Sequence, residues 1–133
     1  MGIQSIEVYS KERTQMVDIT AKVEQIIKGI GIKEGICYLY TPHTTAGLTI
    51  NENADPTVTA DILAELNKLI PFSDGYRHSE GNSAAHIKSS LTGASLLLFV
   101  SGGRLLLGTW QGVYFCEFDG PRQRKVLVKV VEG

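Results

Sequence analysis

The sequence contains few cysteines and no long apolar run. Its 133 residues include 2 cysteines, Cys37 and Cys116, which lie in separate apolar segments without CxxC spacing. This pattern favours two buried reduced thiols over a disulfide or a zinc pair. The longest strongly apolar run, residues 96–100, is far too short to span a bilayer, and the N-terminus lacks a signal-peptide pattern. We therefore expect a cytoplasmic protein without a membrane partner.

The sequence also lacks an excess of charge of either sign and the common nucleotide-binding and catalytic motifs. The formal net charge is −1 at pH 7, which argues against a general nucleic-acid partner because such proteins carry a broad basic surface. No P-loop lysine motif, GxGxxG, GxSxG or HExxH word occurs. The first three absences argue against kinase, dinucleotide-dependent dehydrogenase and α/β-hydrolase classes, and the last means that no helical metal motif is present.

The remaining pattern predicts one α+β domain spanning residues 1–133, with a largely antiparallel β-sheet or sandwich and about three helices. In the last segment Val126, Val128 and Val130 alternate with Lys125 and Lys129, as in a strand with one buried face. Apolar patterning predicts strands at residues 3–9, 15–18, 36–40, 47–51, 95–101, 104–107, 109–118 and 124–131.

Three helices are predicted between these strands. The first is capped by Asp18 or Thr20 and ends at Gly31, and the second begins at Asp55 and Pro56. The third runs from residue 82 or 83 to residue 93, with His86 opposite its apolar face. The residues expected to be buried at helical spacing are Val23, Ile26, Ile27 and Ile30 in the first helix, Ile62, Leu63, Leu66 and Leu69 in the second, and Ala84, Ile87 and Leu91 in the third.

The 3 histidines lie in polar segments that also contain glycine, hydroxyl or charged residues. If the fold brings His43, His78 and His86 together, they form a centre able to bind a divalent metal or to transfer protons near neutral pH. The alternative is that each one caps or hydrogen-bonds its own loop. Because His86 lies near a helix N-terminus, its protonation is disfavoured there, which suits a metal ligand.

Other polar residues are candidates for the same site. Glu52 follows an apolar strand, where a carboxylate can serve as a metal ligand or general base, with Asp74 and Glu80 as alternatives. Trp110 and Gln111, in the word GTWQG at 108–112, offer a stacking surface and an amide, although a core tryptophan at a bulge fits equally well. An anion site could draw on basic and hydroxyl side chains, namely Arg77, Lys88, Arg122, Arg124, Thr44, Thr45, Ser89 and Ser90.

Together these words resemble the YjbQ-like family, small bacterial and archaeal proteins described as secondary thiamine-phosphate synthases. The resemblance covers nearly the whole chain. It rests on HTTAG at 43–47, Asn51 and Glu52, YRH at 76–78, Asn82, AHIKSSL at 85–91, GTWQG at 108–112 and EFDGPR at 117–122. It implies an α+β homotrimer and an activity that joins a hydroxymethylpyrimidine diphosphate to a thiazole phosphate with release of pyrophosphate.

The residues and the resemblance together give one set of expected roles. We expect His43, Glu52 and His86 to be catalytic, and His43, His78 and His86 to bind a divalent metal, zinc or magnesium. The side chains expected to bind the phosphorylated substrate are Thr44, Thr45, Asn51, Arg77, Asn82, Lys88, Ser89, Trp110 and Gln111. The alternative class is a non-catalytic protein that binds a metal or a phosphorylated small molecule.

Overall fold

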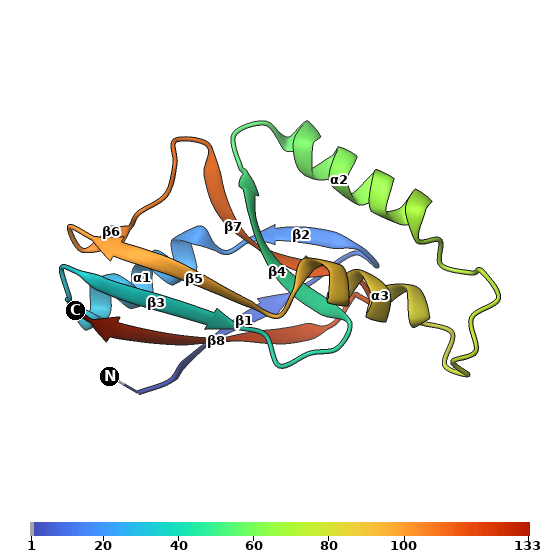
Figure 1. The fold of residues 1–133 in the computed structure, drawn as a ribbon, viewed down its shortest axis with the longest axis horizontal. Helices are drawn as coiled ribbons and strands as arrows, with labels where there is room; N and C mark the ends of the chain where they lie inside the picture. The colour runs from blue at the N-terminus through green and yellow to red at the C-terminus, as the bar shows by residue number, and fades with distance from the viewer. Residues whose placement is uncertain (1) are drawn as a thin grey trace.

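The computed structural model describes residues 2–133 and contains two antiparallel sheets and three helices, which confirms the α+β prediction. The five-stranded sheet has the order β1 (Gln4–Tyr9), β8 (Gln123–Glu132), β3 (Gly35–Tyr40), β5 (Ser95–Ser101), β6 (Arg104–Leu105). The three-stranded sheet has the order β2 (Gln15–Asp18), β7 (Gln111–Glu117), β4 (Ala46–Glu52). The helices are α1 (Thr20–Ile30), α2 (Pro56–Leu69) and α3 (Ser83–Thr92) (Figure 1).

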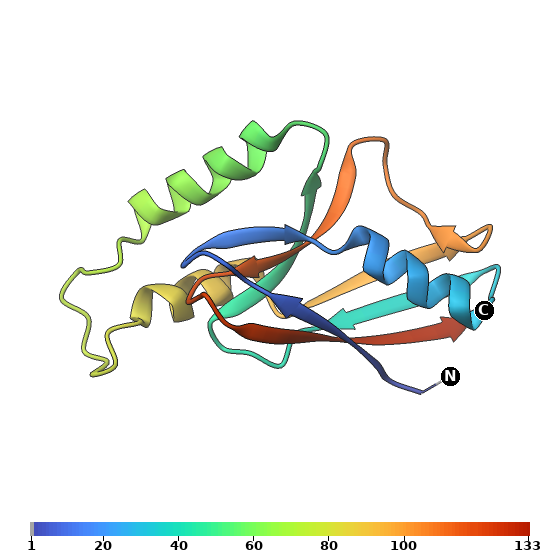
Figure 2. The ribbon, with the colours of Figure 1, turned by 180° about the vertical axis from the view of Figure 1, so that it is seen from behind.

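The core lies on the inner face of the five-stranded sheet. Because side chains alternate along a strand, the buried Val126, Val128 and Val130 share the inner face of β8. They pack with Val23 and Ile27 of α1 and with side chains of β4 and β7 in one apolar cluster. Figure 2 shows α1 lying across this side of the sheet. The left-handed Gly31, at φ 81°, ends α1 as predicted.

Short turns join several of these elements. Gly102 and Gly103 both have positive φ angles and connect β5 to β6, which confirms the expected hairpin. Asp55 caps α2 by accepting a hydrogen bond from the Thr57 backbone N–H, also as predicted. The N-cap residue of α1 is Ile19 and not Asp18 or Thr20, although the Asp18 side chain accepts from the Thr20 backbone N–H at 2.9 Å. Within residues 2–133, no helix is long and apolar enough to cross a membrane.

The predicted buried faces of α2 and α3 are only partly confirmed. In α2 no residue is fully buried: Ile62, Leu63 and Leu66 are partly buried, whereas Leu69 is 68% exposed. In α3 the buried side chains are Ala84, Ala85 and Lys88, whereas Ile87 and Leu91 face outward. The reason is that α3 lies close against β4, where small side chains fit and a lysine finds polar partners nearby. Gly47 of β4 permits this approach, because a Cβ there would collide with Thr92.

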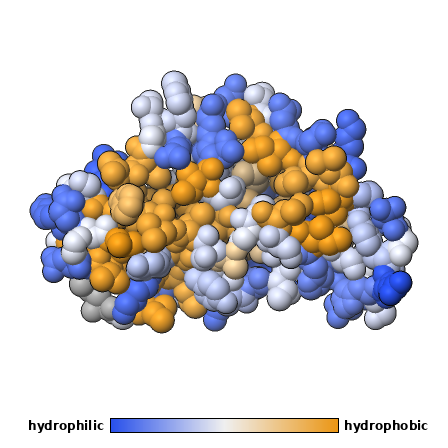
Figure 3. All heavy atoms as spheres, viewed as in Figure 1, coloured by the Kyte–Doolittle hydropathy of each residue, from blue (hydrophilic) through white to orange (hydrophobic). Residues whose placement is uncertain are grey.

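A broad apolar surface remains exposed. The outer face of the five-stranded sheet carries Tyr38, Tyr40, Leu97, Phe99 and Val131, each at least 43% exposed. The strand register places Tyr38 beside Leu97. Figure 3 shows apolar side chains gathered over β3 and β5 and again over α3. Exposed apolar surface of this extent is typical of an interaction face.

Candidate functional site

The structure brings His43, His78 and His86 to a single cleft. The cleft has a volume of about 620 Å³ and lies between the segment after β3, the loop before α3 and the turn before β8. The side chains that line it are mostly polar: Pro42, His43, Thr44, Thr45, His78, Glu80, Asn82, His86, Asp119, Arg122 and Arg124. Residues from three distant parts of the sequence therefore converge here, as expected for the histidines.

His43 is fixed by the backbone of β8. The pairing of β3 with β8 ends at Tyr40 and Leu127, and two residues earlier in β8 the Lys125 backbone N–H donates to His43 Nε2 at 3.0 Å. The half-buried imidazole also lies edge-on to Phe115, at 6.5 Å between ring centroids. Burial lowers the pKa of His43, the positive charge of Arg124 lowers it further, and Glu117 opposes both. The neutral imidazole is therefore favoured.

His78 and His86 form a pair on the other side of the cleft. Their ring centroids are 5.5 Å apart with an interplanar angle of 86°. His86 belongs to the first turn of α3, and its ring leaves the helix on the side away from the buried Lys88. His78 comes from the loop that precedes the helix. This pair provides four ring nitrogens for protons or ligands within a small volume.

The third side of the cleft is formed by Asn82, Asp119 and Arg122, which are hydrogen-bonded to one another. Asn82 Nδ2 donates to Asp119 Oδ2 at 2.9 Å. Arg122 donates to the Asp119 backbone oxygen through Nε at 2.9 Å and to its Oδ2 through Nη2 at 3.0 Å. The Arg122 side chain remains 49% exposed. The beginning of α3 and the turn before β8 are thus joined through one carboxylate.

A buried ion pair lies directly beneath these groups. Glu117 is 0% exposed and Arg124 is 4% exposed, and the two side chains are hydrogen-bonded. Burial by itself would raise the pKa of Glu117, but hydrogen bonds from Arg124, Ser10 and the Asp119 backbone outweigh it and lower the pKa. Both side chains are therefore charged in the folded protein.

The three histidines do not form a prebuilt metal centre. Among residues 2–133, no group of three or more His, Cys, Asp or Glu side chains has the spacing to hold a metal ion. The His43 Nε2 lone pair is already used by the Lys125 N–H, and a metal needs a free imidazole lone pair. The residues present thus do not fit the three-histidine ligand set, and we assign no chemical step to a metal.

Four of the expected site residues lie at the opposite end of β4 and β7. The strand register places Asn51 beside Gly112 and Glu52 beside Gln111, far along the strands from Ala46 and Glu117. Glu52 accepts from the Asp55 backbone N–H at 3.2 Å, and Gln111 accepts from the Gly108 N–H at 2.8 Å. Trp110 is 63% exposed. None of these four side chains lines the histidine cleft.

Lys88, Ser89 and Arg77 also lie outside the lining of the cleft. Lys88 is fully buried; it donates to Asn67 Oδ1 at 2.6 Å and lies 4.5 Å from the centre of the Phe72 ring. Its pKa is lowered by burial and then by the nearby Arg13. Ser89 donates to the Ala46 backbone oxygen at 2.6 Å and so attaches α3 to β4.

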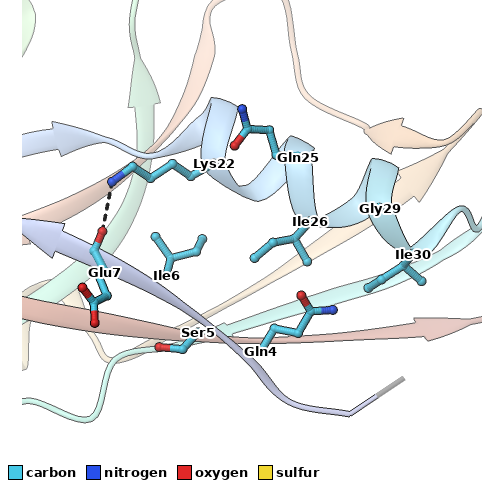
Figure 4. Close-up of a pocket in the computed structure, with 9 residues that line it drawn as sticks. All are labelled: Gln4, Ser5, Ile6, Glu7, Lys22, Gln25, Ile26, Gly29 and Ile30. Carbon is cyan, nitrogen blue, oxygen red and sulfur yellow. Dashed lines mark hydrogen bonds between the residues drawn. The ribbon is translucent and has the colours of Figure 1, made fainter.

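A second hollow, of about 550 Å³, lies between β1 and α1. Figure 4 shows Gln4, Gln25, Ile26 and Ile30 around it. Lys22 reaches across and donates to the Glu7 backbone oxygen at 2.9 Å (Figure 4). This hollow contains no histidine and no convergent charged cluster, so we do not consider it the candidate site.

Sequence reasoning missed the groups that anchor the cleft. The sequence predicts Arg124 only as part of an anion site, and it gives Glu117 and Asp119 no role beyond their place in the word at 117–122. A signal did exist, because Arg124 has the same strand parity as Val126, Val128 and Val130 and therefore faces inward with them. A charged side chain at such a position requires a buried partner.

The chain resembles known proteins over almost its full length. The model of the family described as UPF0047 protein YjbQ-like matches residues 4–133. UPF0047 protein YugU of Bacillus subtilis is 49% identical over 130 residues, covering 97% of this chain and 98% of its own. UPF0047 protein MJ1081 of Methanocaldococcus jannaschii is 50% identical over 125 residues, covering 94% and 91%. The crystal structure of a yjbq/upf0047 family protein from Clostridium acetobutylicum matches with a TM-score of 0.94 at 50% identity, covering 96% and 99%.

Proposed function

The chain belongs to the YjbQ-like UPF0047 family, and we propose that it is a small cytoplasmic enzyme that acts on a phosphorylated small molecule at the histidine cleft. The observation that carries this proposal is the convergence of three imidazoles, a hydroxyl group and a partly exposed arginine at one cleft. Imidazole and guanidinium N–H groups are good donors to phosphate oxygens. Imidazoles also transfer protons near neutral pH.

The specific reaction we propose is thiamine-phosphate synthesis. The bond between the pyrimidine methylene carbon and the diphosphate oxygen breaks, a bond from that carbon to the thiazole nitrogen forms, and pyrophosphate leaves. Such a transfer depends on positioning and on stabilising the leaving anion more than on covalent catalysis. His43 Nδ1, Thr44 and Arg122 would bind the diphosphate, while His78 and His86 would hold or release protons beside it.

A divalent metal, zinc or magnesium, is a separate part of the proposal. His78, His86 and Glu80 all line the cleft and are the side chains that would hold the ion after a local rearrangement; a bound divalent cation would neutralise charge on a leaving diphosphate. Metal analysis of untagged protein and of His78→Ala tests this part. An equal metal content in both proteins would reject these ligands.

A non-catalytic binding protein is the second candidate, and one observation favours it. Glu52, the expected general base, lies outside the cleft, and the Asp119 carboxylate is already engaged by Asn82 and Arg122. Chromatographic assay with the two phosphorylated precursors and magnesium separates the candidates. Product formation that is lost in His43→Ala supports the enzyme. Thermal stabilisation by the precursors without product supports binding alone.

We further propose a homotrimer, which the exposed apolar sheet face and the exposed α2 support. Closed oligomers cover such surfaces with copies of the same chain. In a trimer, Trp110 and Gln111 of one subunit could reach the histidine cleft of another, which they do not reach within a subunit. Sedimentation of dilute protein tests the assembly. Activity recovered by mixing His43→Ala with Trp110→Ala subunits would support a shared site, and a fully active monomer would contradict it.

A further inference from the structure

We propose that Glu117 is a positioning residue of the histidine cleft. Through Arg124 it fixes the segment that carries His43, and through the turn at Asp119 it fixes the beginning of α3, so that the cleft presents its N–H donors to a phosphate group before any ligand arrives. This inference rests on the proposed phosphate-binding function. It gives Glu117, which does not line the cleft, a role in the site above it.

The Glu117 carboxylate joins three segments of the chain. Ser10 Oγ donates to its Oε1 at 2.7 Å, and the Asp119 backbone N–H donates to its Oε2 at 3.0 Å. Arg124 Nε donates to Oε1 at 2.9 Å, and Arg124 Nη2 donates to Oε2. A buried carboxylate is costly unless its oxygens are satisfied in this way. Four donors from the segment after β1, the turn before β8 and β8 itself meet that need.

Arg124 transmits this anchoring to the histidine segment. Its Nη2 group also donates to Thr45 Oγ1 at 2.8 Å and to the Thr45 backbone oxygen at 3.2 Å. The same backbone oxygen accepts from the Phe118 N–H at 3.2 Å. Thr45 is buried and lies two residues from His43. A guanidinium has rigid, planar geometry, so holding it at Glu117 also holds the carbonyl and hydroxyl that it contacts.

The second connection runs from Glu117 to α3. The hydrogen bond from the Asp119 N–H orients the residue whose side chain accepts from Asn82, the N-cap of α3, and from Arg122. The turn also packs tightly here, since a Cβ on Gly120 would come within 2.9 Å of Glu117 Cγ. His86 is the fourth residue of that helix. Glu117 is thus connected to both walls of the cleft.

The contact with Lys125 determines which nitrogen of His43 faces a ligand. Because Nε2 accepts the Lys125 N–H, the neutral ring carries its proton on Nδ1. In residues 2–133, no protein acceptor is bonded to Nδ1. His43 is therefore arranged as an Nδ1–H donor, which matches the oxygen of a phosphate and does not match a metal ion.

The test uses proton–nitrogen correlation spectra of the histidine rings in the ligand-free, full-length protein. We expect His43 in the natural protein to show a protonated Nδ1 and an accepting Nε2. Glu117→Gln keeps the shape but removes the charge and presents an N–H where acceptors are needed. We expect a mixture of His43 tautomers and a lower titration midpoint, because Arg124 loses its counter-charge. Pyrophosphate affinity should fall about tenfold, as for loss of one hydrogen bond to a charged group.

Two further variants complete the test. Thr45→Val removes only the hydroxyl that Arg124 contacts, and it decides the question by the same spectra if Glu117→Gln does not fold. Glu65→Gln also removes one negative charge, but from an exposed contact with Lys68 at 4.0 Å. This control should change neither the His43 spectra nor the affinity for pyrophosphate. Unaltered His43 signals in folded Glu117→Gln and Thr45→Val would overturn the positioning role. Altered signals without pyrophosphate binding by any protein would retain that role and reject the proposed function.

Discussion

The histidine cleft and the hollow between β1 and α1 have similar volumes, about 620 and 550 Å³, but they differ in what lies beneath them. The first rests on a fully buried ion pair, Glu117 and Arg124. The second is bordered by exposed and apolar residues of β1 and α1, Glu7 among them, and is crossed by one lysine. Size alone therefore does not distinguish the two hollows.

The difference concerns preorganisation. A buried ion pair has a large desolvation cost, and apolar residues of similar volume often give equal or greater stability. Its presence beneath the cleft is better explained by the fixed geometry that it gives to Thr45, Asp119 and the groups attached to them. The polar side chains around the other hollow do not hold a comparable set of segments in place. A small charged ligand should therefore bind in the histidine cleft and not in the hollow between β1 and α1.

The largest expected difference is in stability. Glu117→Ala leaves Arg124 charged, buried and without its partner, which should lower the free energy of unfolding by about 3–5 kcal/mol. Gln25→Ala, in the second hollow, should change it by less than about 0.5 kcal/mol because it is a surface substitution. Urea denaturation measures both. Equal small effects would mean that the buried pair provides no particular anchoring.

Ligand affinity should show the next largest difference. His43→Ala removes an N–H donor from the cleft and should weaken pyrophosphate binding about tenfold. Lys22→Met removes a positive charge from the second hollow and should leave the affinity unchanged. Calorimetric titration at fixed ionic strength provides the comparison. A greater loss of pyrophosphate affinity in Lys22→Met than in His43→Ala would contradict this prediction, because it would place the anion in the hollow between β1 and α1.

The smallest expected difference is in pH dependence. The folded protein holds the pKa of His43 below its ordinary value of 6.5, so protonation is easier in the unfolded chain. The corresponding stability is complete above pH 6.5 and is lost as the pH falls from 6.5 through the lower folded pKa. His43→Gln retains an acceptor for the Lys125 N–H and should remove this part of the pH dependence, whereas Lys22→Met should retain it. If the free energy of unfolding depends on pH in the same way in His43→Gln and in the natural protein between pH 7 and 5, the lowered pKa of His43 is contradicted.

Local sequence patterns predicted much of the fold because their physical causes are local. The alternation in β8, the Asp55 and Pro56 helix start and the paired glycines after β5 each depend on a few neighbouring residues. The shared location of the histidines was also predicted, although only as a condition on the fold. It followed from their common polar surroundings.

The buried face of α3 depends on tertiary packing, so a helical wheel predicted only part of it. The wheel predicts Ala84, Ile87 and Leu91 as buried, but the space against β4 admits small side chains such as Ala84, and Asn67 and Phe72 accommodate the buried Lys88. Glu52 failed as a cleft residue because the direction of β4 carries it to the far end of the sheet. A single sequence does not reveal that distance.

The central claim is that the histidine cleft binds a phosphate-bearing ligand, and titration with pyrophosphate tests it most directly. The chain has 3 histidines, so every imidazole can be followed in one spectrum together with the backbone amides. We predict saturable shifts of the His43, His78 and His86 rings and of the Arg122 amide. Shifts confined to Lys22 and Gln25, or no shift at saturating pyrophosphate, would contradict the claim.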